Sequence, residues 1–433
     1  MILAPSSVSD RRRVLSWALY DWANSAFATV VMAGFFPVFF KEFWASDLAV
    51  TDSTFWLGLA NSVASLVIVV AAPLLGAVAD QLGAKKRFLI VFTVLGVLAS
   101  AALFWLGQGH WEMALAIYLF GLLGFSGSNI FYDALLMDVA AASEYERVSA
   151  YGYALGYLGG GLLFALFVVM TLYPETFGFT GAAQVVQLAF LGVALWWTLF
   201  AVPIALWVRE KRGNGERSAS DAVRAAFREL VSTIRHIRSL RETFLFLLAY
   251  WFYIDGVDTI VRMAVDYGLS IGFPASSLMV ALLITQFIGF PAALVFGRLG
   301  SRWGAKRGIL LAIGIYMLVI VGASQMDRVE EFYALAVAIG LVQGGIQALS
   351  RALFASFVPP GRTAEFFGFF NMVGKFAAVF GPSLVALAAA LTGDPRLSLL
   401  PILLLFLIGA GLLLRVDVET GRAAASAADR RQP

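Results

Sequence analysis

The sequence predicts an all-α membrane protein with about twelve transmembrane helices, arranged as two six-helix halves related by pseudo-symmetry. Three observations lead to this prediction. Hydrophobic residues make up 60% of the chain and charged residues only 14%, whereas soluble globular proteins contain about 45–50% apolar residues. The apolar residues gather into segments long enough to cross a bilayer. A basic stretch near the midpoint divides these segments into two equal groups.

The expected spans follow one another in order along the chain, because each crossing needs roughly 20 apolar residues. In an N-terminal bundle, residues 1–208, we expect spans near Val14 to Phe40, Phe55 to Ala79, Phe88 to Leu106, Trp111 to Leu135, Ser149 to Leu172 and Gln184 to Val208. In a C-terminal bundle, residues 243–416, we expect spans near Thr243 to Tyr267, Ser277 to Phe296, Gly308 to Ser324, Glu331 to Phe354, Glu365 to Leu391 and Leu397 to Leu414.

The stretch that joins the bundles, residues 209–242, is the one sizeable hydrophilic interruption. It holds nine Lys or Arg residues against four acidic residues between Arg209 and Arg241. Since Lys and Arg beside membrane spans stay in the cytoplasm, we expect this linker and both termini to be cytoplasmic. Apolar residues at helical spacing, including Val223, Phe227 and Leu230, predict an amphipathic helix on the inner leaflet, and a solvated linker is the alternative. Residues 417–433 are predicted to form a disordered tail.

Scarce residue types limit the chemistry of the chain. It has no cysteine and two histidines, and His110 and His236 both fall in predicted loops, so we expect no disulfide, no metal site, no cofactor and no catalytic residue. No suitably placed hydrolase motif marks an enzyme, and no P-loop marks a nucleotide-driven pump. Linker and tail are too short for the output domain of a sensor. The basic residues lie in short loops, where membrane topology accounts for them, so we expect no nucleic-acid partner.

The two bundles also carry a weak internal repeat. Equivalent positions, in chain order, are Tyr20 and Tyr250, Thr29 and Thr259, Gly76 and Gly297, Gly83 and Gly304, Asp133 and Arg351, and Gly152 and Gly368. Equivalences that keep their order, with slowly changing offsets, are typical of transporter folds built from duplicated halves.

Polar side chains inside the spans are functional candidates, because a charge at the bilayer centre costs at least about 2.5–3.5 kcal/mol. They occur at helical spacing on a few helices. These are Asp21 and Asn24 in the first span, Asn129 and Asp133 in the fourth, Asp255, Asp258 and Arg262 in the seventh, Gln343, Gln347 and Arg351 in the tenth, and Lys375 in the eleventh. Structural roles are the alternatives: Asp258 could neutralise Arg262, Asp21 could interact with its helix dipole, and the amides could serve helix packing.

Two groups of motifs resemble those of known protein families. The run Gly76-Ala-Val-Ala-Asp80-Gln-Leu-Gly83-Ala-Lys85-Lys86-Arg87 resembles the signature loop of the major facilitator superfamily, although Gln81 and Ala84 stand where basic residues are common. More specific runs are similar to the autophagy-related vacuolar amino-acid effluxer family and its bacterial relatives, namely Tyr20-Asp21-Trp22-Ala23-Asn24, Asp255-Gly256-Val257-Asp258, Gln347-Ala348-Leu349-Ser350-Arg351 and Gly374-Lys375-Phe376. The resemblance covers nearly the whole chain.

The resemblance implies a secondary transporter with a twelve-helix rocker-switch fold, in which the first, fourth, seventh and tenth helices line a central cavity. We expect a monomer in the lipid bilayer of a bacterial cytoplasmic membrane. The expected small-molecule substrate is an amino acid or another small zwitterion, with or without proton coupling. The alternatives are an exporter or permease for a different small organic solute, and a lipid scramblase.

Residue roles follow from the same resemblance. The expected substrate contacts are Asn24, Asn129, Asp255, Asp258, Arg262, Gln343, Gln347 and Lys375. A coupled proton would bind Asp255, with Asp21 as the alternative. Gating is expected at Asp80, Gly83 and Arg87 of the signature loop and at the pair Asp133 and Arg351. In the resembled fold, this pair would approach only when the cytoplasmic side is closed; otherwise Asp133 would pair with Arg147 and Arg351 would snorkel to the headgroups.

Overall fold

The computed structural model describes residues 10–210, 225, 228, 240–359, 361–377, 380–393 and 396–429. Every regular element in these residues is helical. Eleven helices are long and apolar enough to cross a membrane, judged by length and composition. The remaining expected span corresponds to two successive shorter helices, and the structure therefore confirms the predicted all-α membrane fold. The amphipathic helix expected within residues 209–242 lies almost wholly outside the described residues.

The N-terminal half contains six spans. The first is composite, with α1 (Arg11–Ala26), a π-helical stretch η1 (Phe27–Phe35), α2 (Phe36–Phe39) and a second π-helical stretch η2 (Phe40–Trp44). The other five are α3 (Val50–Leu82), α4 (Lys85–Phe104), α5 (Trp111–Val139), α6 (Tyr145–Leu172) and α7 (Ala182–Trp207), with short 3₁₀ turns at η3 (Ala142–Glu144) and η4 (Pro174–Phe177).

The C-terminal half repeats the pattern. Its elements are α9 (Arg241–Ser270), α10 (Ala275–Trp303), α11 (Ala305–Ala323), α12 (Val329–Ala355), α13 (Thr363–Ala377), α14 (Phe380–Thr392), the 3₁₀ turn η5 (Leu397–Leu399), α15 (Ile402–Arg415) and α16 (Val418–Asp429). Helices α13 and α14 together occupy the expected eleventh span.

The C-terminal tail is the element for which the sequence-based expectation was wrong. Residues predicted to be disordered form α16, and Gly421 fits closely enough on Phe357 that a Cβ would lie 2.6 Å from its ring. Arg422 on α16 lies 3.8 Å from Glu146 on α6. The tail of the C-terminal half thus touches the N-terminal half.

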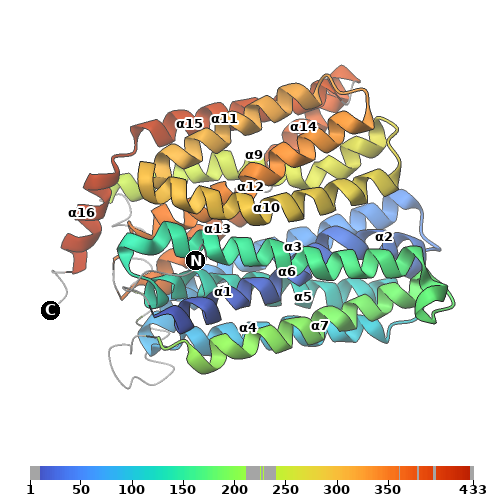
Figure 1. Ribbon diagram of the computed structural model, residues 1–433, viewed down its shortest axis with the longest axis horizontal. Helices are drawn as coiled ribbons and strands as arrows, with labels where there is room; N and C mark the ends of the chain where they lie inside the picture. The colour runs from blue at the N-terminus through green and yellow to red at the C-terminus, as the bar shows by residue number, and fades with distance from the viewer. Residues whose placement is uncertain are drawn as a thin grey trace.

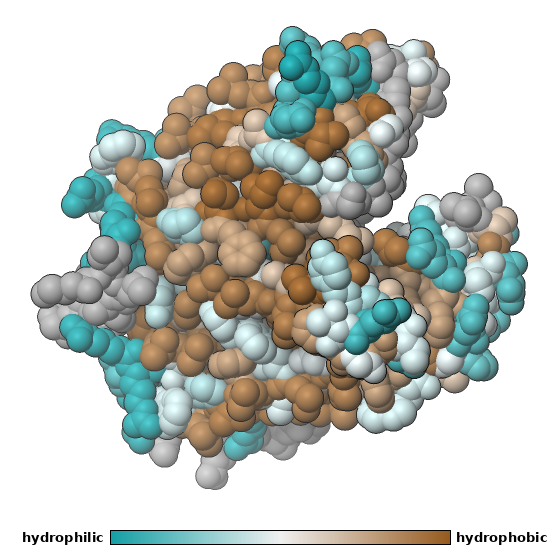
Figure 2. Space-filling view, turned by 45° about the vertical axis from the view of Figure 1, so that its right-hand side comes forward, coloured by the Kyte–Doolittle hydropathy of each residue, from teal (hydrophilic) through white to brown (hydrophobic). Residues whose placement is uncertain are grey.

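Figure 1 shows the N-terminal helices below and the C-terminal helices above, with α16 projecting at one end. We call this end, where α1 begins and α15 finishes, the terminal end, and the opposite one the distal end. Figure 2 shows apolar side chains covering the flank of the molecule, as expected for a lipid-facing surface, and a hollow between two lobes on the side brought forward. The halves therefore meet at the terminal end and part at the distal end.

Equivalent turns in the two halves confirm the internal repeat. Gly83 between α3 and α4 and Gly304 between α10 and α11 both have positive φ, 56° and 86°, a conformation that glycine adopts without a steric penalty. Two residues after Gly304, the Lys306 ammonium donates to the carbonyls of Leu414 and Val416, each at 2.8 Å. Lys86 closes the C-terminal end of α7 in the same way, so each half ties its last span to its third.

Glycines allow close helix approach inside the N-terminal half. A Cβ on Gly124 of α5 would lie 2.4 Å from the backbone nitrogen of Gly96 on α4, whereas a Cβ on Gly58 would meet nothing within 4 Å. Small residues of this kind are the usual means by which helices associate in lipid, since backbones can then pack directly.

We expect Gly124→Ala to lower the stability of the protein by about 1–3 kcal/mol, because α4 and α5 must move apart to admit the methyl group. The midpoint of thermal unfolding of the purified protein in detergent measures this effect. Gly58→Ala, on the exposed face of α3, is the matched control and should leave the midpoint unchanged. Equal midpoints for the two variants would contradict the close α4–α5 packing.

Candidate functional site

A buried arginine joins the two halves near the terminal end. Arg351 on α12 is 2% exposed, and its Nη1 donates to Oδ1 of Asp133 on α5 at 2.9 Å. Its Nε and Nη2 donate to Oγ and the carbonyl oxygen of Ser149 on α6, both at 2.9 Å. The structure thus brings together the two repeat-related residues of opposite charge, and Arg351 turns inward instead of snorkelling. A guanidinium with this many matched acceptors is a strong, directional contact.

Aromatic rings complete the surroundings of Arg351. The guanidinium carbon lies 4.4 Å from the ring centre of Tyr153, 4.9 Å from that of Trp17 and 5.2 Å from that of Tyr132. Gly152 makes room for two of these rings, since a Cβ there would lie 2.6 Å from the Tyr132 hydroxyl and 2.9 Å from the Trp17 ring. The charge therefore sits among π faces that attract a cation.

A second carboxylate stands beside the pair. Asp21 on α1 accepts hydrogen bonds from Tyr132 and Ser25, each at 3.2 Å, and its Oδ2 lies 4.0 Å from Arg351. Asn371 on α13 donates to the other oxygen of Asp133 at 3.1 Å. Asn371 was not among the expected site residues, although it stands one helical turn before Lys375 on the same span. The cluster contains two carboxylates and one guanidinium.

A further set of contacts between the halves lies closer to the terminal end. Asp80 on α3 accepts a hydrogen bond at 2.8 Å from the backbone N–H of Glu365, in the first turn of α13. Lys85 forms an ion pair with Asp138 and donates to Thr363 Oγ1 at 3.0 Å. The acid of the signature loop therefore faces the start of an opposing helix, where the dipole favours a negative charge. Arg87 is exposed and takes no part in these described contacts.

Backbone packing reinforces these contacts. Helix α3 lies along α13, and α6 lies along α10. A Cβ on Gly76 would come within 2.2 Å of the Ala364 carbonyl oxygen, and one on Gly368 within 2.5 Å of the Ala72 carbonyl oxygen. We call the contacts of Asp80, Lys85, Gly76 and Gly368 with the opposite half, together with the Arg351 cluster, the terminal seal.

The other expected substrate residues come from several helices. Asn24 donates to Asn129 at 2.6 Å, which joins α1 to α5. Asp258, Gln347 and Lys375 are half-buried on α9, α12 and α13. The side chain of Arg262 lies outside the described residues, so its expected substrate contact, and the alternative pairing with Asp258, stay predictions.

Asp255 has a different environment from the cavity expected for it. Both of its carboxylate oxygens accept the backbone N–H of Gly381 at 3.0 Å, in the first turn of α14. The residue is 1% exposed. A carboxylate at this place stabilises the start of a helix through hydrogen bonding and the helix dipole. Asp255 therefore ties α9 to α14 within the C-terminal half.

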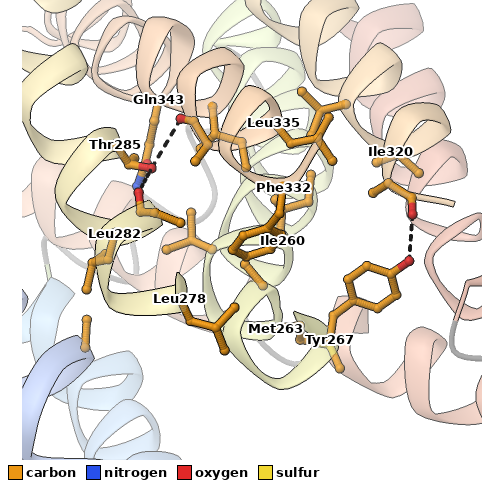
Figure 3. Close-up of a pocket in the computed structure, with 18 of the residues that line it drawn as sticks. Ile260, Met263, Tyr267, Leu278, Leu282, Thr285, Ile320, Phe332, Leu335 and Gln343 are labelled. Atoms are coloured by element: carbon orange, nitrogen blue, oxygen red, sulfur yellow. Dashed lines mark hydrogen bonds between the residues drawn. The ribbon is translucent and has the colours of Figure 1, made fainter. Parts of the chain in front are cut away.

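An apolar cavity of about 240 Å³ lies between α9, α10, α11 and α12 and borders the π-helical part of the first span. Figure 3 shows its wall, with Leu282, Phe332 and Leu335 around the space and Gln343 and Thr285 at one side. The Thr285 hydroxyl donates a hydrogen bond to the Ala281 carbonyl at 3.0 Å, and the Tyr267 hydroxyl donates one to the Ala323 carbonyl at 2.6 Å. Among the expected substrate residues whose side chains the structure describes, Gln343 alone lines this cavity.

Comparison with known proteins gives a consistent result. The family model described as "Vacuole effluxer Atg22 like" matches residues 46–145 and 137–426. An uncharacterized MFS-type transporter, YxiO of Bacillus subtilis (strain 168), is 40% identical over 408 residues, which cover 94% of this chain and 95% of that protein. Autophagy-related protein 22-1 of Aspergillus niger is 28% identical over 64% of this chain, and the match spans only 48% of that longer relative.

Solved structures show the same fold. The human organic anion transporter MFSD10 (TETRAN) superposes with a TM-score of 0.70 at 17% identity, covering 93% of this chain and 99% of that chain. FucP, a major facilitator superfamily transporter captured in the outward conformation, gives a TM-score of 0.69 at 14% identity, covering 94% of this chain and all of that chain, 100%.

Charge reversal tests whether Asp133 and Arg351 hold the terminal end closed. Asp133→Arg and Arg351→Asp should each shift the equilibrium between the closed and the open terminal end toward the open state by about 1–3 kcal/mol, which is roughly 5- to 150-fold. The readout is the alkylation rate of a single cysteine placed at buried Thr363, and the chain has no cysteine of its own to interfere.

The combined exchange, Asp133→Arg with Arg351→Asp, is the decisive control because it rebuilds the pair in reverse. We expect it to return most of the way to the slow alkylation of the parent. Single effects that simply add in the double variant would mean that the two side chains act independently.

Proposed function

The chain belongs to the "Vacuole effluxer Atg22 like" family of major facilitator transporters, and we propose that it carries a small zwitterionic metabolite, an amino acid or short peptide. Its place would be the cytoplasmic membrane of a bacterium, in line with the origin of its 40%-identical relative. The fungal relatives are named for autophagy, and the family description speaks of a vacuole effluxer.

The observation that carries the proposal is the Arg351 cluster between the halves. Groups of both signs meet there, with Asp21 and Asp133 on one half and Arg351 on the other. A zwitterion presents an ammonium and a carboxylate, and charge-assisted hydrogen bonds to both ends fix its orientation. Amides of Asn24 and Asn129 lie on the same helices, α1 and α5, as the two carboxylates.

Alternating access follows from how the halves meet. The terminal seal closes one end while the surface is hollowed at the other (Figure 2). Rocking the halves would break the contacts of Asp80, Asp133 and Arg351 and expose the cluster at the terminal end. We propose gating roles for these residues and for the Gly83 turn, with Gln343, Gln347, Asp258 and Lys375 as further substrate contacts toward the cavity.

Topology supports a cytoplasmic terminal end. Arg11, Lys85, Arg307 and Arg415 all lie at helix ends there, and so do Arg209 and Arg241, which flank the basic linker. Because cationic segments resist translocation, we propose that both termini face the cytoplasm. The distal end, and with it the open hollow, would then face outward.

We propose Asp21 as the site of a coupled proton, in place of Asp255. The cluster holds one carboxylate more than it has guanidinium groups, so a proton can enter without breaking the 2.9 Å contact between Asp133 and Arg351. Asp255, by contrast, is engaged by the start of α14, and protonation there would weaken a structural contact.

Transport by purified protein in liposomes tests the proposed cargo. We expect labelled amino acids or dipeptides to accumulate saturably under an imposed proton gradient and to compete with one another. Protein carrying Asp133→Arg and liposomes without protein are the controls. Success of a sugar or drug after failure of the whole panel would refute the zwitterion, and phospholipid movement without soluble cargo would favour a scramblase.

Neutral amide substitutions separate the two candidate proton sites. We expect Asp21→Asn to abolish gradient-driven accumulation while sparing exchange of cargo for cargo, because an amide cannot gain or lose the coupled proton. The folded fraction of Asp255→Asn protein should still accumulate cargo in response to the proton gradient. The reverse pattern, with coupling lost only in Asp255→Asn, would move the assignment to Asp255.

A further inference from the structure

The pocket that holds the Arg351 guanidinium is built entirely by the other half of the molecule. Its members come from α1, α5 and α6, and we call them the aromatic cage: Trp17, Asp21, Tyr132, Asp133 and Tyr153. Three rings and two carboxylates around one cation form the arrangement by which proteins bind ammonium and guanidinium groups.

Contacts inside the N-terminal half hold the cage in shape. The Trp17 indole donates to the Tyr132 carbonyl at 2.9 Å, and the two rings stack with centres 4.4 Å apart. The Tyr132 hydroxyl in turn donates to Asp21. None of these three contacts involves Arg351, so the part of the cage formed by Trp17, Tyr132 and Asp21 does not depend on α12.

Opening of the terminal end would leave the cage without its cation. Asp133 would lose Arg351 and also Asn371, since both come from the C-terminal half. Two carboxylates would then face a cavity beside three rings, without the guanidinium of Arg351. Removing one partner from a buried ion pair is strongly unfavourable unless another cation or water replaces it.

We propose that, in the state open at the terminal end, the aromatic cage binds the ammonium or guanidinium group of the cargo in place of Arg351. This inference rests on the proposed alternating access and specifies which part of the cargo is recognised. Arg351 and the cargo cation occupy the same place and exclude one another. The terminal end can therefore close with Arg351 in the cage only after the cargo cation has left the cage, either to the solution or toward the other substrate contacts.

The chemistry of the cage defines the ligand class. Rings attract a cation through their negative faces, and carboxylates accept its N–H groups. A solute that carries only negative charge finds no partner there. Methylguanidinium is a suitable probe because it copies the end of the arginine side chain that fills the cage in this structure.

Removal of the resident side chain gives a direct binding test. In purified Arg351→Ala protein, low millimolar methylguanidinium chloride should raise the midpoint of thermal unfolding above that in sodium chloride of equal ionic strength. Wild-type protein, whose cage is filled, should show a smaller rise. Arg351→Gln, with a longer polar side chain, is the second background in case the alanine variant does not fold.

Two second-site variants assign the effect to the cage. Adding Asp133→Asn to Arg351→Ala should weaken the apparent affinity for methylguanidinium by about tenfold or more, because a charge-assisted contact is lost. Adding Asp327→Asn should not change it, since Asp327 is exposed at the distal end and pairs with Arg396. An equal response in all proteins, or no response in folded Arg351→Ala, would overturn the proposal.

The Thr363→Cys reporter, with its cage residues and Arg351 unchanged, provides a second measurement. By linkage, a ligand that binds only the open state must populate that state. Methylguanidinium should therefore speed alkylation of the Thr363→Cys reporter, whereas sodium should not. An unchanged rate would contradict the cage as a cation site, while failure of amino-acid transport alone would count against the cargo and leave this binding result standing.

Discussion

The arrangement depends on one requirement: a guanidinium removed from water needs matched negative charge and hydrogen-bond acceptors. Arg351 meets this requirement only at the boundary between the halves, because Asp133 and both acceptor atoms of Ser149 belong to the opposite half. The charge of Arg351 is therefore matched by these acceptors only while the terminal end is closed. Close backbone approaches at Gly76 and Gly368 follow from the same closure, since α3 and α13 can touch only when the halves meet there.

Duplication explains why the charge pair lies where it does. Gly83 and Gly304, with Lys86 and Lys306, still perform matching tasks in the two halves. Asp133 and Arg351 occupy equivalent positions but have diverged to opposite charges. Residues related by a pseudo-twofold axis tend to face one another across it, so divergence in sign converts a symmetric contact into an attraction. Asp133 and Arg351 thus occupy symmetric positions but form an asymmetric charge pair.

Hydropathy, charge and repeat offsets predicted the spans and the halves, because these depend on local composition and on symmetry. The approach of Asp133 to Arg351 was expected from the resembled fold, applied to two repeat-related positions of opposite charge. Trp17, Tyr132 and Tyr153 were not singled out, since an aromatic residue in an apolar helix looks like core wherever it points. The role of Asp255 depends on where α14 begins, which no periodicity reveals. The apolar cavity could not be predicted from the sequence either, because residues such as Leu282 or Phe332 could equally face lipid. Helix α16 was missed because its stability comes from contacts with Phe357 and Glu146, far away in sequence.

Helix α16 gives the terminal end a second fastening of a different physical kind. The Arg422 side chain is 43% exposed and lies 3.8 Å from Glu146, which is 10% exposed. Dissolved ions can therefore reach the Arg422 side of this pair, whereas Arg351 is buried. At physiological ionic strength the Debye length is about 8 Å, and exposed ion pairs are screened accordingly. The two fastenings therefore respond to different surroundings: the inner one to the occupant of the cage, the outer one to the salt content of the solution around the C-terminal helix.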